Sequence, residues 1–169
     1  MKHSMQLIAA TLVLSAAVAR TPGMAESAPQ GAINAVIAEF MNAIRSKNKD
    51  QFLSLFLDPG HTSWQAVNGD AVAEKKRATT ADTVKARINP NANPTAFIEG
   101  LASKSATTEE TFSNVSIEGD ADVAAVSFDY SFKIDRLVTN TGTEHWLLVR
   151  TDQGWRITSV NWSIETYMP

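Results

Sequence analysis

The sequence contains no cysteine among its 169 residues. This excludes disulfide bonds, thiolate metal ligands and a cysteine-linked lipid anchor. Histidine is scarce as well, with three in the chain, and none stands in an H-x-H or H-E-x-x-H spacing, so we predict no metal site. The chain also lacks a glycine-rich phosphate loop and a G-x-S-x-G motif, and we predict no cofactor.

No apolar run near the N-terminus is long enough for a membrane-spanning helix, which needs about 20 residues. Residues 7–18 (LIAATLVLSAAV) form an uncharged apolar stretch preceded by Lys2, which is typical of a secretory signal peptide. Small-x-small cleavage sites lie at residues 17–19 and 23–25. Pro22 and Gly23 break the apolar stretch before the second site, which favours cleavage after Ala25. We therefore predict a signal peptide at residues 1–25 and an exported protein, periplasmic or secreted, with no membrane attachment after cleavage.

Excess positive charge is also absent. Lys2 and Arg20 leave with the signal peptide, so the 15 basic residues become 15 − 2 = 13 against 18 acidic ones. A mildly acidic domain lacks the basic surface to which nucleic acids and anionic membranes bind. We therefore predict neither as a partner. The remaining 169 − 25 = 144 residues are enough for one domain held together by an apolar core.

After a polar linker at residues 26–31 (ESAPQG), the sequence predicts two helices. The first has apolar residues at the helical spacing i, i+3, i+4, i+7, namely Ile33, Val36, Ile37, Phe40, Met41 and Ile44. A polar break at residues 46–49 precedes a shorter apolar group, which Asp58-Pro59-Gly60 ends. A third helix is predicted from Pro94, with Asn93 as its cap. Residues 68–94 otherwise show no clear pattern.

Residues 62–67 (TSWQAV) predict a first strand, and from residue 107 the apolar period changes to two. The alternation is clearest over residues 124–134, which indicates a long, half-buried antiparallel strand. Turns are predicted at Gly119-Asp120, at residues 140–142 (NTG) and at residues 152–154 (DQG). Helices followed by a strand meander predict an α+β fold, with three N-terminal helices packed against one face of a mainly antiparallel sheet.

The C-terminal block EHWLLVRTDQGWRITSVNWSIE resembles the NTF2-like superfamily, in its SnoaL-like branch. KNKDQFLSLF also stands where that family has a short helix rich in leucine and phenylalanine. The resemblance, over residues 32–166, implies a cone in which a strongly curved sheet surrounds the helices and leaves a pocket at its open end. It also implies homodimers through the outer face of the sheet. The fold hosts isomerases, dehydratases and members without a known reaction, so it does not decide the function.

Strand alternation provides candidates for the pocket wall. Tyr130 is the one polar member of the apolar set on residues 124–134 that must face the helices. The predicted ligand-binding residues are Phe40, Trp64, Phe97, Phe128 and Tyr130. Similarity to the steroid isomerases of the family places Phe40 at their oxyanion tyrosine and Trp64 near their catalytic aspartate. The resemblance thus implies that those catalytic groups are missing here.

Tyr130 and His145 are the candidate catalytic residues, as an acid–base pair, provided that both face inward. The alternation leaves the facing of His145 open, because apolar residues occupy both sides of residues 145–151. Glu144 and Arg150 are interpreted as an ion pair on the surface of the sheet, so the sequence predicts no inward carboxylate.

Three functional hypotheses follow. The favoured one is an exported domain that binds a small, largely apolar molecule in its pocket, without an assignable reaction. The second is an isomerase or hydro-lyase that uses Tyr130 and His145. The third is a non-catalytic module that forms a homodimer through the sheet and has a collapsed pocket.

Overall fold

The structure is a computed structural model that describes residues 29–167. Its centre is a six-stranded sheet in which five strands have the order β1-β5-β4-β3-β2, while β6 pairs with β4. The strands are β1 (Ser63–Asn68), β2 (Thr108–Gly119), β3 (Val123–Ile134), β4 (Leu137–Thr151), β5 (Gly154–Ile164) and β6 (Thr166–Tyr167). Strands β2 to β5 form an antiparallel meander, and β1 joins its edge parallel to β5.

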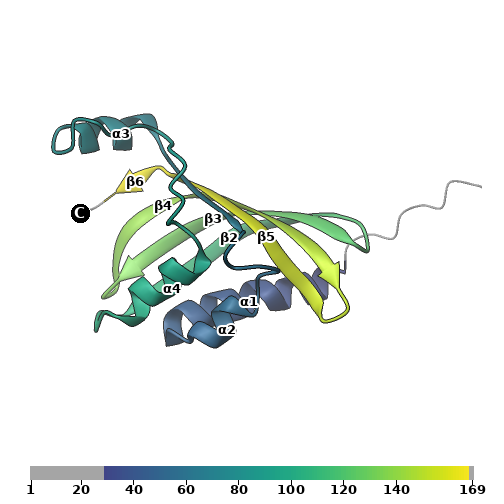
Figure 1. Ribbon diagram of the computed structural model, residues 1–169. Coiled ribbons are helices and arrows are strands. Elements are labelled where there is room, and N and C mark those ends of the chain that lie inside the picture. Colours follow the sequence, from purple (N-terminus) through teal and green to yellow (C-terminus); the bar gives the residue numbers. More distant parts are fainter. Residues whose placement is uncertain (1–28, 168–169) are drawn as a thin grey trace, which may run out of the picture.

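Three of the helices lie against one face of the curved sheet (Figure 1). They are α1 (Gln30–Ser46), α2 (Lys49–Leu53) and α4 (Pro94–Ala102). The apolar stripe of α1 is buried as predicted. The chain turns between α1 and α2 at Lys47, whose φ of 53° is left-handed, and the Asn48 side chain then caps α2 by accepting from the Gln51 N–H at 3.0 Å.

Helix α4 begins where the sequence predicts. The Asn93 side chain accepts a hydrogen bond from the Ala96 N–H at 2.9 Å, and Pro94 occupies the first turn. The helix buries Ile98 and Leu101 in the core shared with the sheet. This cap fixes the start of the helix and, with it, the position of Phe97 one turn later.

A fourth helix corrects the expected number of three within residues 29–167. Helix α3 (Asp70–Arg77) lies in the segment without a clear pattern and is set apart from the other helices, beside the β6 end of the sheet (Figure 1). It buries only Val72 and Ala73, which is too short an apolar stripe for periodicity to reveal. The returning chain holds it, because the Arg77 side chain donates to the Thr83 carbonyl at 2.9 Å.

The turn between β3 and β4 is also corrected. It consists of Asp135 and Arg136, with φ values of 48° and 68°, and two positive φ values are typical of a type I′ hairpin. Residues 140–142, predicted as that turn, are part of β4. Gly142 is required there because a Cβ atom would collide with the backbone carbonyl of Ser163, where the end of β5 crosses β4.

The predicted signal peptide, residues 1–25, lies wholly within residues 1–28, which are outside the described part of the chain. Within residues 29–167, none of the helices combines the length and the apolar character that crossing a bilayer requires.

Candidate functional site

A cavity of about 230 Å³ lies between the helices and the inner face of the sheet. Every layer of the fold contributes to its wall. Six of the lining side chains are aromatic: Phe40 from α1, Trp64 from β1, Phe97 from α4, Tyr130 and Phe132 from β3, and Trp162 from β5. Val160 and Ile164 add aliphatic surface, and the polar lining residues are Glu110, Asn140 and Glu144.

Three of these aromatic side chains, those of Trp64, Phe97 and Trp162, form a continuous aromatic wall. The ring of Trp64 lies 5.2 Å from that of Phe97 and 5.3 Å from that of Trp162, centre to centre. These separations are in the range of favourable aromatic pairs. The three rings come from three different elements, so the wall depends on the complete fold.

Four of the five predicted pocket residues line this cavity, namely Phe40, Trp64, Phe97 and Tyr130. Phe128 faces the same side of the sheet but lies deeper, packed against Phe112 at 4.0 Å and Trp146 at 5.0 Å between ring centres. It is a core residue and does not line the cavity.

Two carboxyl groups face the cavity, and the prediction that no carboxylate points inward is wrong. Glu110 and Glu144 are only 6% and 4% exposed. On β4, Glu144 shares the buried face with Trp146, whereas Arg150 is exposed at the far end of the strand, so the two form no surface pair. In the sequence, Trp146 and Leu148 on the face of Glu144 compete with Leu147 and Val149 on the other face, so periodicity gives no signal that orients Glu144.

Burial raises the pKa of both carboxyl groups. For Glu144 the pKa rises to about 7, although the Trp146 indole N–H, which donates to its Oε1 at 2.5 Å, acts in the opposite direction. The pKa of Glu110 is raised well above its usual range, first by burial and then by the negative charge of Glu144. Near neutral pH this pair therefore holds protons that exposed glutamates would have lost.

Glu110 differs from Glu144 in its hydrogen bonding. None of the hydrogen bonds or ion pairs within residues 29–167 involves the Glu110 carboxyl, whereas Glu144 accepts from Trp146. The Glu110 oxygens are not sealed in the core, since no fully enclosed side-chain oxygen or nitrogen in this part of the chain lacks a partner. They therefore face the cavity, where an occupant can reach them.

The hydroxyl of Tyr130 is used within the protein. It donates to the backbone carbonyl of Ser163 at 2.8 Å and so links β3 to the end of β5. Burial, and then the carboxyl groups of Glu110, Glu144 and Glu165, raise the pKa of Tyr130 above its ordinary value. The phenol stays neutral and keeps only its accepting lone pair for an occupant of the cavity.

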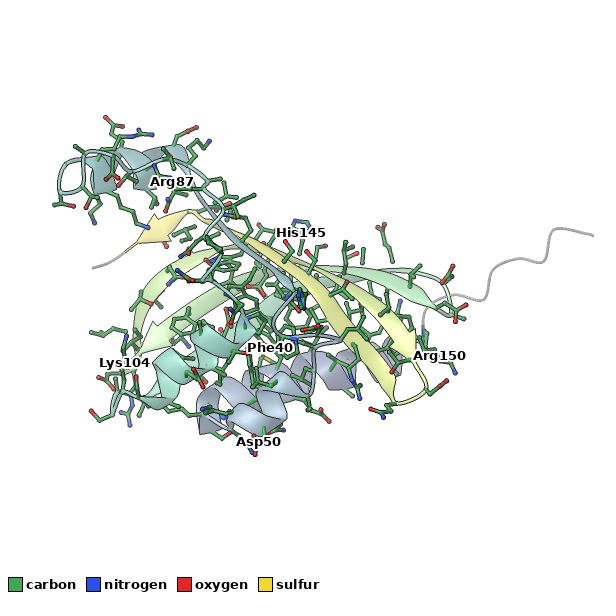
Figure 2. All side chains as sticks on the ribbon, viewed as in Figure 1. Phe40, Asp50, Arg87, Lys104, His145 and Arg150 are labelled. Atoms are coloured by element: carbon green, nitrogen blue, oxygen red, sulfur yellow. The ribbon has the colours of Figure 1, made fainter. Side chains whose placement is uncertain are left out.

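The structure does not bring His145 to this site. Its side chain is exposed on the outer face of the sheet, next to Ser127 and Asn161 on the neighbouring strands. Figure 2 shows His145 on the outer side and Phe40 between the sheet and the helices. The predicted pairing of Tyr130 with His145 is therefore wrong, because their side chains project from opposite faces. Nor does the described part of the chain contain a group of three or more potential metal-binding side chains.

This chain therefore belongs by its architecture to the α+β proteins in which an open, curled sheet holds helices and a cavity on its inner face. No protein-family model matches the sequence, and neither does any curated protein. Solved structures do match, and they show that the chain has the NTF2-like fold expected from the sequence. The sequence identities are low, so the likeness concerns the fold alone.

Three of these structures illustrate the likeness. An NTF2-like protein from Cytophaga hutchinsonii has a TM-score of 0.54 at 14% identity, over 80% of this chain and 98% of the other. A proposed NTF2-like dehydratase from Streptomyces avermitilis has 0.55 at 12%, over 80% and 95%. The beta subunit of a proposed aromatic-ring-hydroxylating dioxygenase from Novosphingobium aromaticivorans has 0.58 at 15%, over 82% and 90%.

Proposed function

We propose that this protein is exported and that its cavity binds a small, largely apolar organic molecule. The proposal is carried by the aromatic lining, because six of the eleven residues around a space of about 230 Å³ have aromatic rings. Sites for drug-sized ligands span roughly 300–1,000 Å³, and a dry cavity of about 150 Å³ in another protein accommodates benzene. The volume therefore favours a molecule with a single ring.

Thermal unfolding with neutral single-ring compounds tests this function. Toluene and benzyl alcohol should raise the unfolding temperature in a concentration-dependent manner, because a ligand of the native state stabilises it by mass action. Trp64→Ala should reduce this shift, since it removes the ring that connects Phe97 and Trp162. Trp155→Phe is the matched control, because Trp155 is buried in the core without lining the cavity. The absence of any shift at millimolar concentrations would count decisively against a binding pocket.

A second candidate function is acid–base catalysis on the bound molecule, as in an isomerase or a hydro-lyase. The observation that favours it is the carboxyl pair, in which burial raises the pKa of Glu144 to about 7 and, together with the charge of Glu144, raises the pKa of Glu110 well above its usual range. A base with a pKa near the working pH, next to an acid that keeps its proton, suits proton transfer. The dehydratase among the similar folds agrees with this chemistry.

Proton abstraction can be followed with a probe ketone that fits the cavity. With cyclohexanone in deuterated buffer, Glu144 would remove α-protons and the carbon would recover deuterium, which nuclear magnetic resonance detects. Wild type should exceed the Glu144→Gln variant in exchange rate, and the Glu109→Gln variant should match wild type, because Glu109 pairs with Lys133 outside the cavity. Equal rates in wild type and Glu144→Gln would rule out this base.

A further inference from the structure

The charged groups around the cavity are all of one sign. Glu110 on β2 and Glu144 on β4 lie on either side of β3, where they pair with Phe132 and Phe128, and Tyr130 stands between them. Glu165, which follows β5, adds a third carboxyl close enough to influence Tyr130. The lining residues from α1, α4, β1 and β5 are aromatic or aliphatic, Asn140 on β4 is a neutral amide, and none of the described lining residues is basic.

No basic side chain from the neighbouring surface reaches this pair within residues 29–167. Lys133 follows Phe132 on β3, but its ammonium group lies 3.3 Å from Glu109, on a residue that does not line the cavity. Burial and the charge of the other carboxyl are the effects that raise the pKa of Glu110, and no cation acts against them. The chain thus buries two acids without supplying their counter-ion.

Glu110 also lines the cavity without a hydrogen-bond partner among the described residues. A carboxyl group that borders a cavity without a hydrogen-bond partner in the protein carries a free-energy cost unless a ligand, an ion or water binds it. A neutral apolar molecule would leave this cost in place, and an anion would increase it. A donor that carries positive charge would remove it.

The aromatic wall favours the same type of occupant. The faces of tryptophan, tyrosine and phenylalanine rings attract cations, and this attraction is stronger where water is excluded. Trp64, Phe97 and Trp162 form such a wall around the cavity that Glu110 and Glu144 also line. Aromatic faces combined with carboxylates match an ammonium group attached to an apolar body.

We propose that the ligand of the cavity is an organic ammonium ion of about one ring in size, whose N–H groups donate hydrogen bonds to the carboxyl oxygens of Glu110 and Glu144. The inference rests on the proposed binding function and names the class of ligand. The apolar body of the amine occupies the aromatic part of the cavity, and its charge replaces the missing counter-ion. The phenol oxygen of Tyr130, whose proton is committed to Ser163, is a further acceptor between the two carboxyls.

Ammonium binding must be coupled to proton release. Burial of both groups, and for Glu110 also the charge of Glu144, keep protons on the pair near neutral pH, and a bound cation stabilises the ionised forms. The protons therefore leave as the amine enters. Affinity should rise as the pH increases from about 5.5 to about 8, because fewer protons then have to be displaced.

Calorimetric titration with benzylamine and benzyl alcohol tests the proposal, because the two probes differ by an ammonium group in place of a hydroxyl. At about pH 8 benzylamine should bind at least about ten-fold more tightly, and this preference should shrink at about pH 5.5. The heat of benzylamine binding should also vary with the ionisation enthalpy of the buffer, because protons are released to it.

Variants locate the effect at the two carboxyls. Glu110→Gln and Glu144→Gln should each weaken benzylamine about ten-fold or more and weaken benzyl alcohol clearly less, because its hydroxyl carries no charge. Glu109→Gln, one residue from Glu110 on the opposite face of β2, should resemble wild type with both probes. Equal affinities of the two probes in wild type, or equal losses in the Glu109 and Glu110 variants, would overturn the ammonium assignment.

The binding results also distinguish a failure of the ammonium inference from a failure of the proposed binding function. If benzyl alcohol binds and benzylamine is not preferred, the cavity is a pocket for neutral ligands and only the ammonium inference fails. If neither probe nor toluene binds, the proposed binding function fails, and the ammonium inference fails with it.

Discussion

Replacing Glu144 by glutamine should stabilise the protein at neutral and alkaline pH, although it alters a buried, hydrogen-bonded residue. The pKa of Glu144 is raised from 4.5 to about 7 in the folded state. Between these values the folded chain binds more protons than the unfolded chain, so stability falls as the pH rises. The stability that Glu144 contributes is fully present below pH 4.5, the pKa of the unfolded chain, and is lost once the pH passes about 7.

The size of this effect follows from the two pKa values. The separation between 4.5 and about 7, at about 1.4 kcal/mol for each pH unit, amounts to about 3 kcal/mol of lost stability at pH 8. Glutamine has no proton to lose, and its amide oxygen can still accept from the Trp146 indole. For a domain of this size, a recovery of about 3 kcal/mol raises the unfolding temperature by about 10 °C. Removal of the Glu144 charge also removes its repulsion of an ionised Glu110, which adds to the gain in stability.

Urea unfolding of wild type and Glu144→Gln at several pH values from about 4.5 to about 8 provides the assay. The two free energies of unfolding should lie close together at the acidic end and diverge as the pH rises. Glu118→Gln, at an exposed position near the end of β2, is the control and should stay within about 0.5 kcal/mol of wild type. A Glu144→Gln variant that is less stable than wild type at pH 8, or a difference that does not change with pH, would refute the reasoning.

Two further predictions concern local geometry. Gly142→Ala should destabilise the protein by about 1–3 kcal/mol in urea unfolding, because the new Cβ atom would collide with the Ser163 carbonyl; a neutral effect would mean that β5 can shift. Asn93→Ala should cost about 1 kcal/mol in the same measurement, because it removes the side-chain acceptor for the Ala96 N–H. Asn93→Asp should retain most of that stability, and an equal loss in both variants would contradict a capping role.

The parts of the fold that sequence reasoning predicts are those where one physical signal acts alone. The alternation on β3 places Tyr130 inward because its other face is polar, and the structure confirms this position. The start of α4 is predictable because Asn93 and Pro94 satisfy two requirements of a helix N-terminus at adjacent positions.

The parts that sequence reasoning misses are those where two signals compete. On β4 both faces carry large apolar side chains, and the exposed Leu147 is as hydrophobic as the buried Leu148. Periodicity therefore could not orient the strand, so the facing of His145 stayed open and Glu144 was wrongly assigned to a surface ion pair. The turn prediction failed similarly: Asn-Thr-Gly is a common turn sequence, whereas Asp135-Arg136 adopts positive φ values that arginine rarely takes.

The candidate site was partly predictable for the same reason. Aromatic residues on inward positions identify four members of the cavity wall, because apolar burial follows from patterning. The two carboxyls could not be found in that way, since a buried acid contradicts the rule that assigns charged residues to the surface. Such violations are expected where a protein binds or transforms a ligand.

The aromatic residues that line the cavity determine how this protein could acquire a new ligand. Phe40 belongs both to the cavity and to the core, where its ring packs against Phe52 and Trp146. Truncating it would enlarge the cavity only by weakening the whole fold. Trp64 and Phe97 are only partly buried and contact the core from outside. Substitutions at Trp64 and Phe97 can therefore change which ligand the cavity binds, while Phe40 stays constant because the core depends on it.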